Sequence, residues 1–202
     1  MLLLTARHCT LPEGSTTQGT SGSVADGGNS ALGTWSSAAN RNSSAHDATL
    51  ITPTSGQVGA SVYNGGVTSA TSVKVTGVSA GPSVGGYVFD SGAMSGAHVL
   101  KVLQTGVSTT SSGVTISVTL ASAVDGGLAV ARGDSGGPVI YASTTSTTSG
   151  AGTGVVVSGL SSSVYTCPGG LAVTDPNIKC YHQVMYSPLQ AVLTALGATL
   201  HV

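Results

Sequence analysis

The sequence predicts an all-β chain that ends in one short helix. Segments in which apolar and polar residues alternate recur along its 202 residues, separated by Ser- and Gly-rich turns at spacings typical of β-barrels. Only 6% of the residues are charged and 40% are hydrophobic, which is enough for a packed core. Close to the C-terminus the apolar spacing changes to that of a helix.

The first part of the chain has weak strand signals. Residues 10–46 are rich in Ser, Gly, Ala and Asn with little periodicity, which predicts long loops. A turn signal at Asn64-Gly65-Gly66 separates two alternating segments. The strands predicted here are residues 2–9, Ala31–Ser36, Asp47–Ile51, Gln57–Tyr63 and Ser72–Val78.

The second part follows a linker near Ala80-Gly81-Pro82 and is more regular. Its predicted strands are Tyr87–Phe89, Ala97–Leu103, Gly113–Leu120, Pro138–Ala142, Gly154–Ser158 and Tyr181–Tyr186. Pro188 then stands at a helix start and Gly197 at its stop, with four apolar residues at helical spacing between them: Leu189, Val192, Leu193 and Leu196.

Charge and hydropathy exclude several classes of function. The net charge is −1 and Lys and Arg form no cluster, which argues against nucleic acids and anionic membranes as partners. No segment approaches the roughly 20 apolar residues of a membrane helix. Met1–Leu4 is too short for a secretory signal, and this abrupt start is typical of a chain that lacks its N-terminal segment.

Three cysteines leave at least one thiol without a mate. Cys167 and Cys180 bracket a Pro/Gly-rich loop, which favours a disulfide between them and leaves Cys9 unpaired. Asp, His and Cys do not cluster at metal-ligand spacing, so we expect neither a metal nor another cofactor.

The most specific motif is Gly133-Asp134-Ser135-Gly136-Gly137-Pro138. It places a hydroxyl on a tight turn whose glycines let backbone N–H groups point at whatever the hydroxyl attacks. Because serine is a weak nucleophile at neutral pH, it needs a base and an acid that orients the base. His8, in Thr5-Ala6-Arg7-His8-Cys9, and Asp47, after His46, supply both.

These motifs, in the order His, Asp, Ser, resemble the chymotrypsin-like serine proteases of the bacterial streptogrisin and α-lytic type. Val88–Gly96 is similar to a streptogrisin hairpin, and the segments Tyr186–Leu189 and Ala195–Leu200 to the C-terminal helix and closing strand. The resemblance implies two packed six-stranded Greek-key barrels, the first incomplete. Residues 1–80 would be the remnant of the first barrel, with the His and Asp, and residues 84–202 would be the second.

The resemblance also assigns roles. Ser135 would attack the scissile carbonyl, His8 would act as the base and Asp47 would orient it. The N–H groups of Gly133 and Ser135 would form the oxyanion hole. The protein would be a secreted, monomeric serine endopeptidase that acts on protein or peptide substrates, and the usual mate of Cys9 would lie upstream of the sequence.

A specificity pocket is implied around Ser135. Its residues would be Ala129, Arg132, Ser158, Gly159, Leu160 and His182. Ala129 stands where trypsin-like enzymes carry an aspartate, and Leu160 would narrow the pocket, which favours a small or medium apolar residue before the cleaved bond. An acidic residue paired with protonated His182 is the alternative. Ser158 would additionally support Asp47.

Three features depart from the pattern: Arg7 beside His8, Asp90 where streptogrisins carry an arginine that pairs with the residue at position 134, and the missing opening strands. Two buried carboxylates would repel one another, and an open barrel would expose strand edges and apolar surface. The alternative function is therefore a catalytically inactive protease homologue or fragment that acts as a β-rich surface or binding module. His46, His98 and His201 stand in no motif, and we expect them to be surface or loop residues.

Overall fold

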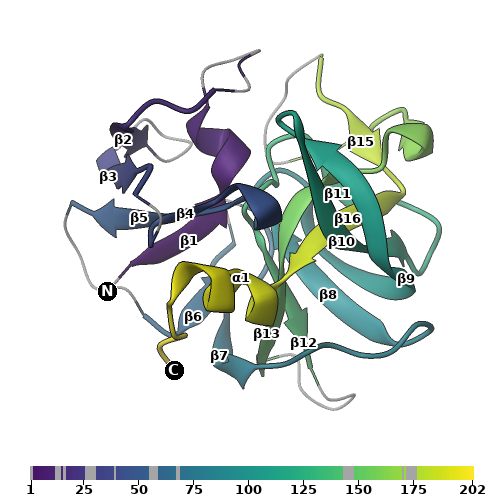
Figure 1. Ribbon diagram of the computed structural model, residues 1–202. Helices are drawn as coiled ribbons and strands as arrows, with labels where there is room; N and C mark the ends of the chain where they lie inside the picture. The colour runs from purple at the N-terminus through teal and green to yellow at the C-terminus, as the bar shows by residue number, and fades with distance from the viewer. Residues whose placement is uncertain are drawn as a thin grey trace.

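The computed structural model of the protein describes residues 2–11, 15, 17–25, 31–38, 40–54, 59–66, 69–142, 148–169, 171 and 177–202. It consists mostly of β-strands with one α-helix, and this confirms the predicted all-β class. In Figure 1 the strands of the N-terminal part lie at one side of the molecule and those of the C-terminal part at the other.

The N-terminal sheet has the strand order β1-β5-β3-β2, and β4 pairs with β5. Its strands are β1 (Leu3–Ala6), β2 (Ser21–Ala25), β3 (Ala31–Ser36), β4 (Asn42–Ser43) and β5 (Ala48–Pro53). β3 has the bounds predicted, whereas β2 was not predicted because Ser-Gly-Ser-Val-Ala has little hydrophobic alternation. Among the described strands this sheet does not close on itself, since β1 and β2 lie at its two edges.

Six strands of the C-terminal part close into a barrel. They pair in the order β12-β8-β9-β10-β16-β13, and β13 pairs back to β12. The strands are β8 (Tyr87–Gly92), β9 (Gly96–Ser111), β10 (Val114–Ala123), β12 (Pro138–Tyr141), β13 (Ser149–Gly159) and β16 (Gln183–Pro188). This closed ring agrees with the six-stranded second barrel that the sequence suggested.

Two further strands attach to the outside of this ring. β7 (Ser72–Val78) pairs in parallel with β13, and β6 (Ser61–Tyr63) pairs with β7. The strands that belong to the sheet of the barrel therefore begin with β6, which is earlier in the chain than the boundary expected near residue 80. Of the strand predicted over Gln57–Tyr63, residues 57 and 58 lie outside the described residues.

The barrel interior is built from the alternate residues of its strands. Val88, Leu100, Val102, Val139 and Val156 are among its buried side chains. A small third sheet, β11-β15-β14, lies beside the barrel and borders the functional site. Its strands are β11 (Val130–Ala131), β14 (Val164–Tyr165) and β15 (Cys180–Tyr181).

Helix α1 (Leu189–Leu196) joins the two parts. Val192 and Leu196 pack with Ala48 and Leu50 of the N-terminal sheet, whereas Leu189 and Leu193 pack with the barrel strand β13. Gly197 ends the helix with φ 58°, a left-handed conformation that glycine adopts without strain. The helix and its stop agree with the sequence prediction.

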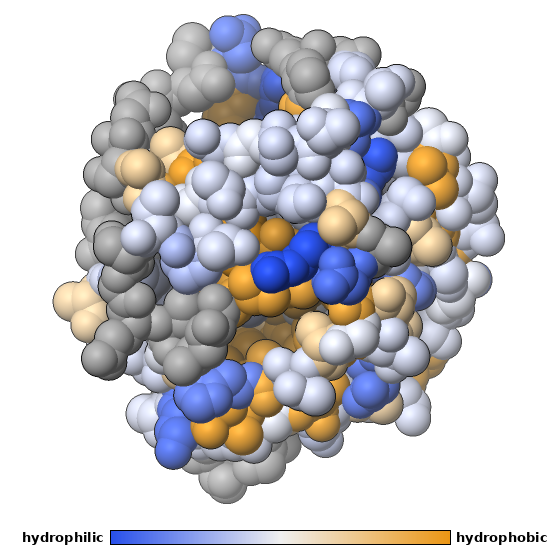
Figure 2. Space-filling view, turned by 60° about the vertical axis from the view of Figure 1, so that its left-hand side comes forward, coloured by the Kyte–Doolittle hydropathy of each residue, from blue (hydrophilic) through white to orange (hydrophobic). Residues whose placement is uncertain are grey.

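Apolar side chains are exposed in a hollow on the face shown in Figure 2. A cavity of about 240 Å³ between β1 and the second sheet is lined by Leu2, Leu4, Val62, Leu189 and Leu200. Water therefore reaches apolar surface at the edge strand β1.

We predict that Leu100→Ala lowers the free energy of unfolding by about 2–5 kcal/mol, because it leaves a cavity in the barrel interior. Leu100 is 0% exposed, and its neighbour Val99, on the opposite face of β9, is 58% exposed. Val99→Ala is the matched control and should cost less than about 1 kcal/mol. Urea unfolding followed by circular dichroism measures both, and equal losses would contradict the assigned faces of β9.

Candidate active site

The β1–β5 pair brings His8 and Asp47 together. Ala6 and Ala48 are antiparallel partners, so the residues after β1 lie beside those before β5. His8 lies in the 3₁₀ turn η1 (Arg7–Thr10), and Asp47 follows the 3₁₀ turn η2 (Ser44–His46). His8 Nδ1 lies 2.6 Å from Asp47 Oδ2, and the backbone N–H of His8 donates to Oδ1 at 2.9 Å.

The Asp47 carboxylate is buried and well supplied with donors. It is 2% exposed, and its backbone has φ 49°, uncommon for a residue with a side chain. A third donor is the hydroxyl of Ser111, at the end of β9, 2.7 Å from Oδ2. The resemblance suggested Ser158 for this role. Ser111 fills it because the long β9–β10 hairpin reaches back to η2.

The imidazole of His8 is held strongly in its charged form. Burial of the ring lowers its pKa, but hydrogen bonds to Asp47 and Cys9 and the charges of these two side chains outweigh burial and raise the pKa to about 10. Asp47 thus both orients the ring and stabilises the imidazolium.

Arg7 is buried beside His8 and does not displace it. Its Nε donates to Gln18 Oε1 at 3.2 Å, and its backbone N–H donates to the carbonyl of Asp47 at 2.8 Å. Arg7, which departs from the family pattern in the sequence, is therefore accommodated by its hydrogen bond to Gln18.

Ser135 lies on the loop between β11 and β12. Its glycine neighbours are required by the backbone, since Gly133 has φ 106° and Gly136 has φ 85°. A Cβ on Gly136 would also collide with Thr5, so this glycine lets the loop pack on β1. The loop thus lies directly beside the strand that leads to His8.

The hydroxyl of Ser135 donates to the carbonyl of Val157 at 2.9 Å. No hydrogen bond between the described residues joins this hydroxyl to the ring of His8. The two side chains nevertheless line one cavity of about 270 Å³.

The N–H groups of Gly133 and Ser135 have no acceptor within the described part of the chain. By contrast, the N–H groups of Asp134 and Gly136 donate to the carbonyls of Ala131 and Val156. Two donors on one glycine-rich turn are thus left for a ligand oxygen.

Two buried carboxyl groups support the Ser135 loop from behind. Asp134 is 1% exposed and accepts backbone N–H bonds from Met94, Ser95 and Ala131 at 2.6, 3.2 and 2.7 Å. Asp90 is fully buried, and its Oδ2 has no hydrogen-bond partner among the described residues. Burial, and then the charge of Asp134, raises the pKa of Asp90 well above its ordinary value.

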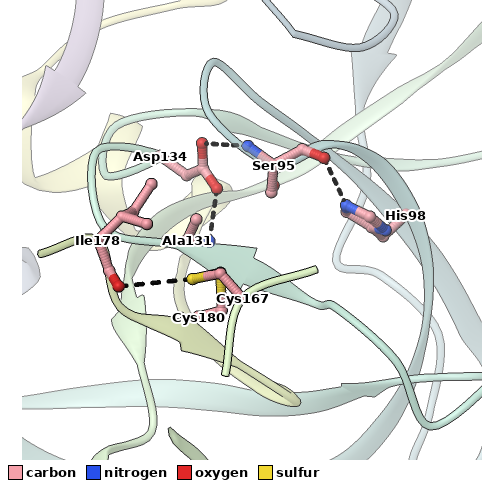
Figure 3. Close-up of a disulfide and its surroundings, with 7 residues drawn as sticks. All are labelled: Ser95, His98, Ala131, Asp134, Cys167, Ile178 and Cys180. Atoms are coloured by element: carbon pink, nitrogen blue, oxygen red, sulfur yellow. Dashed lines mark hydrogen bonds between the residues drawn. A yellow bond between two sulfur atoms is a disulfide. The ribbon is translucent and has the colours of Figure 1, made fainter. Parts of the chain in front are cut away.

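Among the residues that the structure describes, two features other than a cation reduce the expected repulsion between Asp90 and Asp134. Asp134 is held by backbone amides, and the raised pKa of Asp90 favours its protonated, uncharged form. Figure 3 shows the two oxygens of Asp134 with two of these donors, and His98, whose Nε2 donates to the carbonyl of Ser95 at 2.9 Å.

A disulfide joins Cys167 and Cys180 close to this network, as Figure 3 shows. Cys9 is a free, exposed thiol. Its Sγ lies 3.7 Å from the carbonyl oxygen of Ser135, so the thiol borders both His8 and the Ser135 loop.

The structure brings together three of the six residues suggested for the specificity pocket. Arg132, Ser158 and Gly159 line the 270 Å³ cavity with His8 and Ser135. Lys179 and Tyr181 also line it, and the sequence analysis did not identify them. Their contribution depends on the β11–β15 pairing, which two-residue strands do not signal in a sequence.

The other three residues lie elsewhere. Ala129 is fully buried in the barrel core, and Leu160 packs against a second apolar cluster. His182 turns away from Ser135, since its Nδ1 donates to the carbonyl of Gly127 at 2.7 Å and its ring stacks on Tyr165 at 3.8 Å.

In the ranges that the structure describes, no three His, Cys, Asp or Glu side chains are grouped so that they could hold a metal ion. The only α-helix there is eight residues long, and none is long and apolar enough to cross a membrane.

We predict that the ring protons of His8 titrate near pH 10 in NMR spectra, assigned with a His8→Gln variant. Because the folded pKa exceeds 6.5, the ion pair stabilises the fold fully below pH 6.5, and this contribution is lost as pH rises through about 10. Asp47→Asn keeps the shape of the side chain but removes its charge, so the midpoint should fall. An unchanged midpoint in this variant would contradict the proposed cause.

We predict that Asp90→Asn becomes more stable relative to the wild type as pH rises. The folded state keeps a proton on Asp90 that the unfolded chain releases above about pH 4, so wild-type stability falls by up to about 1.4 kcal/mol per pH unit until the raised pKa is reached. Asparagine removes this loss. Asp90→Ala should show the same change in the slope of stability against pH, together with a loss of stability that does not depend on pH, because the shorter side chain leaves a cavity. Parallel stability curves for wild type and Asp90→Asn in urea unfolding from pH 4 to 8 would refute a protonated Asp90.

The sequence matches no protein-family model and no curated protein sequence. Solved structures of bacterial serine proteases are nevertheless similar in fold. A Nocardiopsis protease has a TM-score of 0.65 at 20% identity, over 100% of this chain and 85% of that one. Thermobifida fusca protease A has a TM-score of 0.62 at 23% identity, over 98% and 85%. A glutamic-acid-specific serine protease, described as using a histidine triad in substrate binding, has a TM-score of 0.63 at 18% identity over the same shares. The chain therefore has the fold of the chymotrypsin-like serine proteases, with a closed second barrel and a first barrel that stays open among the described strands.

Proposed function

We propose that the protein is a serine endopeptidase that cleaves peptide bonds through His8, Asp47 and Ser135. The observation that carries this proposal is the pairing of His8 with the buried Asp47, because His8 lines the same cavity as a serine on a glycine-rich turn. The fold that the chain shares with serine proteases supports it.

In the first half of the reaction, the neutral imidazole of His8 takes the proton of the Ser135 hydroxyl. The serine oxygen forms a bond to the carbonyl carbon of the substrate, whose oxygen becomes negatively charged. His8 then donates the proton to the leaving nitrogen, the C–N bond breaks and an acyl-enzyme remains.

In the second half, water takes the place of the amine. His8 removes a proton from the water, the resulting oxygen attacks the acyl carbon, and the proton passes to Ser135 as the ester bond breaks. Asp47 stabilises the imidazolium in both halves, and the unused N–H groups of Gly133 and Ser135 would bind the oxyanion. Each such donor is worth roughly 3–4 kcal/mol in catalysis.

The reaction requires two changes from the state described. Rotation of the Ser135 side chain must exchange the carbonyl of Val157 for Nε2 of His8 as its hydrogen-bond acceptor. His8 must also lose its proton, so we expect activity to rise with pH in the alkaline range.

An extracellular setting fits this function. The Cys167–Cys180 disulfide supports an oxidising compartment, since disulfides are rare in the cytosol. The substrate would be a protein or peptide.

The second candidate is a non-catalytic β module with the same fold. The hydrogen bond from Ser135 to Val157, in place of one to His8, favours it. Whether Ser135 is activated separates the two functions.

A fluorophosphonate probe, which labels activated serines, tests this directly. We expect labelling of the wild type, none of Ser135→Ala, and labelling at least about 100-fold slower for His8→Ala, the lower range of a general base's contribution. Cys9→Ala should still be labelled, which shows that the probe does not report on the nearby thiol. Circular dichroism verifies that each variant is folded. Absence of labelling in folded wild type between pH 7 and 10 would support the non-catalytic module.

A further inference from the structure

One oxygen of the Asp47 carboxylate serves two side chains that come from different parts of the molecule. Oδ2 lies 2.6 Å from His8 Nδ1 and accepts the hydroxyl of Ser111 at 2.7 Å, whereas Oδ1 accepts the backbone N–H of His8 at 2.9 Å. Because Asp47 is buried, water does little to screen these bonds. The hydroxyl and the imidazole therefore share the charge of a single buried oxygen.

The β9–β10 hairpin determines where this hydroxyl lies. Ser111 and Val114 are the last antiparallel pair of the hairpin, and the two residues between them, Ser112 and Gly113, have φ 47° and 78°. Two successive left-handed residues are typical of the tight hairpin turn whose twist matches that of its strands. Directly after the turn, Val114 packs on an apolar cluster of the barrel. The position of Ser111 is thus built into the fold of the hairpin.

We propose that Ser111 is a positioning residue for the His8–Asp47 pair, and that its hydroxyl weakens the hold of Asp47 Oδ2 on the protonated ring of His8. The inference rests on the proposed function and deepens it. The hydroxyl hydrogen carries a partial positive charge and points at the oxygen that stabilises the imidazolium, so it offsets part of that stabilisation. Since the reaction needs the neutral ring, Ser111 extends activity toward lower pH.

The high basicity of His8 makes such an effect matter. With a pKa of about 10, only about one ring in a thousand is neutral at pH 7. If the loss of one donor to Oδ2 raised the pKa of His8 by another unit, this fraction would fall about tenfold. A hydrogen bond that restrains Asp47 is therefore worth as much to the rate as one made by the substrate.

The other titratable groups around the pair are not altered by a substitution at Ser111. The elements packed on η1 and η2, which are β1, β5, β10 and α1, contain no titratable residue. Burial lowers the pKa of His46, so this ring stays uncharged in the alkaline range. The neighbouring groups that titrate or carry charge are Arg7, Cys9 and His46 on the two 3₁₀ turns and Arg132, Lys179 and Tyr181 on the cavity wall.

An NMR titration of the His8 ring tests the proposal without turnover. Ser111→Thr keeps the hydroxyl, and Ser111→Val replaces that hydroxyl by a methyl group of similar size, so this pair of variants isolates the hydrogen bond. We expect the midpoint of His8 in Ser111→Val to lie about one pH unit above that in Ser111→Thr and in the wild type. Ser111→Ala, which adds no bulk, should show the same rise. Ser108→Ala removes a hydroxyl from the exposed face of the same strand and should leave the midpoint unchanged.

The charge of Asp47 provides a further control. In an Asp47→Asn background the shared oxygen carries no full charge, so Ser111→Thr and Ser111→Val should have the same midpoint. The rate of fluorophosphonate labelling gives the second readout. At a fixed pH below the midpoint, Ser111→Val should be labelled about tenfold more slowly than Ser111→Thr, because the neutral fraction of His8 is smaller.

Three results would overturn the proposal: equal midpoints in the folded Ser111→Thr and Ser111→Val variants, a difference between them that persists in the Asp47→Asn background, or slower labelling of Ser111→Val with an unmoved midpoint, which indicates a structural role alone. A rise of the midpoint in Ser158→Ala in place of Ser111→Ala would assign the role to Ser158 and would overturn it too. A raised midpoint in Ser111→Val, with no labelling of the folded wild type, would instead refute the proposed catalysis alone.

Discussion

The buried carboxylate of Asp47 is the interaction on which the site depends. This carboxylate forms hydrogen bonds with the ring and the backbone N–H of His8, which follows a strand of the N-terminal sheet. It also accepts a hydrogen bond from the hydroxyl of Ser111, which belongs to the C-terminal barrel. A charge 2% exposed is tolerated only because these donors replace water. Since the donors come from both parts of the molecule, Asp47 also fixes how the two parts meet, together with helix α1, which packs on both.

Much of this fold could be predicted from sequence because its signals are local. The bounds of β3 and β7 and the helix with its Gly197 stop follow from alternation, spacing and one glycine. Pairing was less predictable. β6 and β7 precede the linker, but β7 pairs with β13 and β6 pairs with β7, because the residues of a strand do not reveal which strand it pairs with.

In the functional site, too, local motifs could be predicted from the sequence, whereas long-range contacts could not. The residues proposed to carry the chemistry, His8, Asp47 and Ser135, stand in recognisable motifs, whereas the residues that support them do not. Ser111 is one serine among many, 64 residues from Asp47, and Lys179 reaches the cavity only through a two-residue strand. The Asp90–Asp134 pair was identified as a conflict, but its resolution by backbone amides and a retained proton required coordinates.

Closure of the barrel has a consequence for the order in which the molecule is assembled. β16, which lies between β10 and β13 in the ring, comes after His8, Asp47 and Ser135 in the chain. Because the ribosome synthesises the chain from its N-terminus, His8 and Ser135 emerge before β16, and the ring that supports them cannot close until β16 has followed. The last strand of the ring thus joins a chain in which the imidazole, the carboxylate and the hydroxyl are already present.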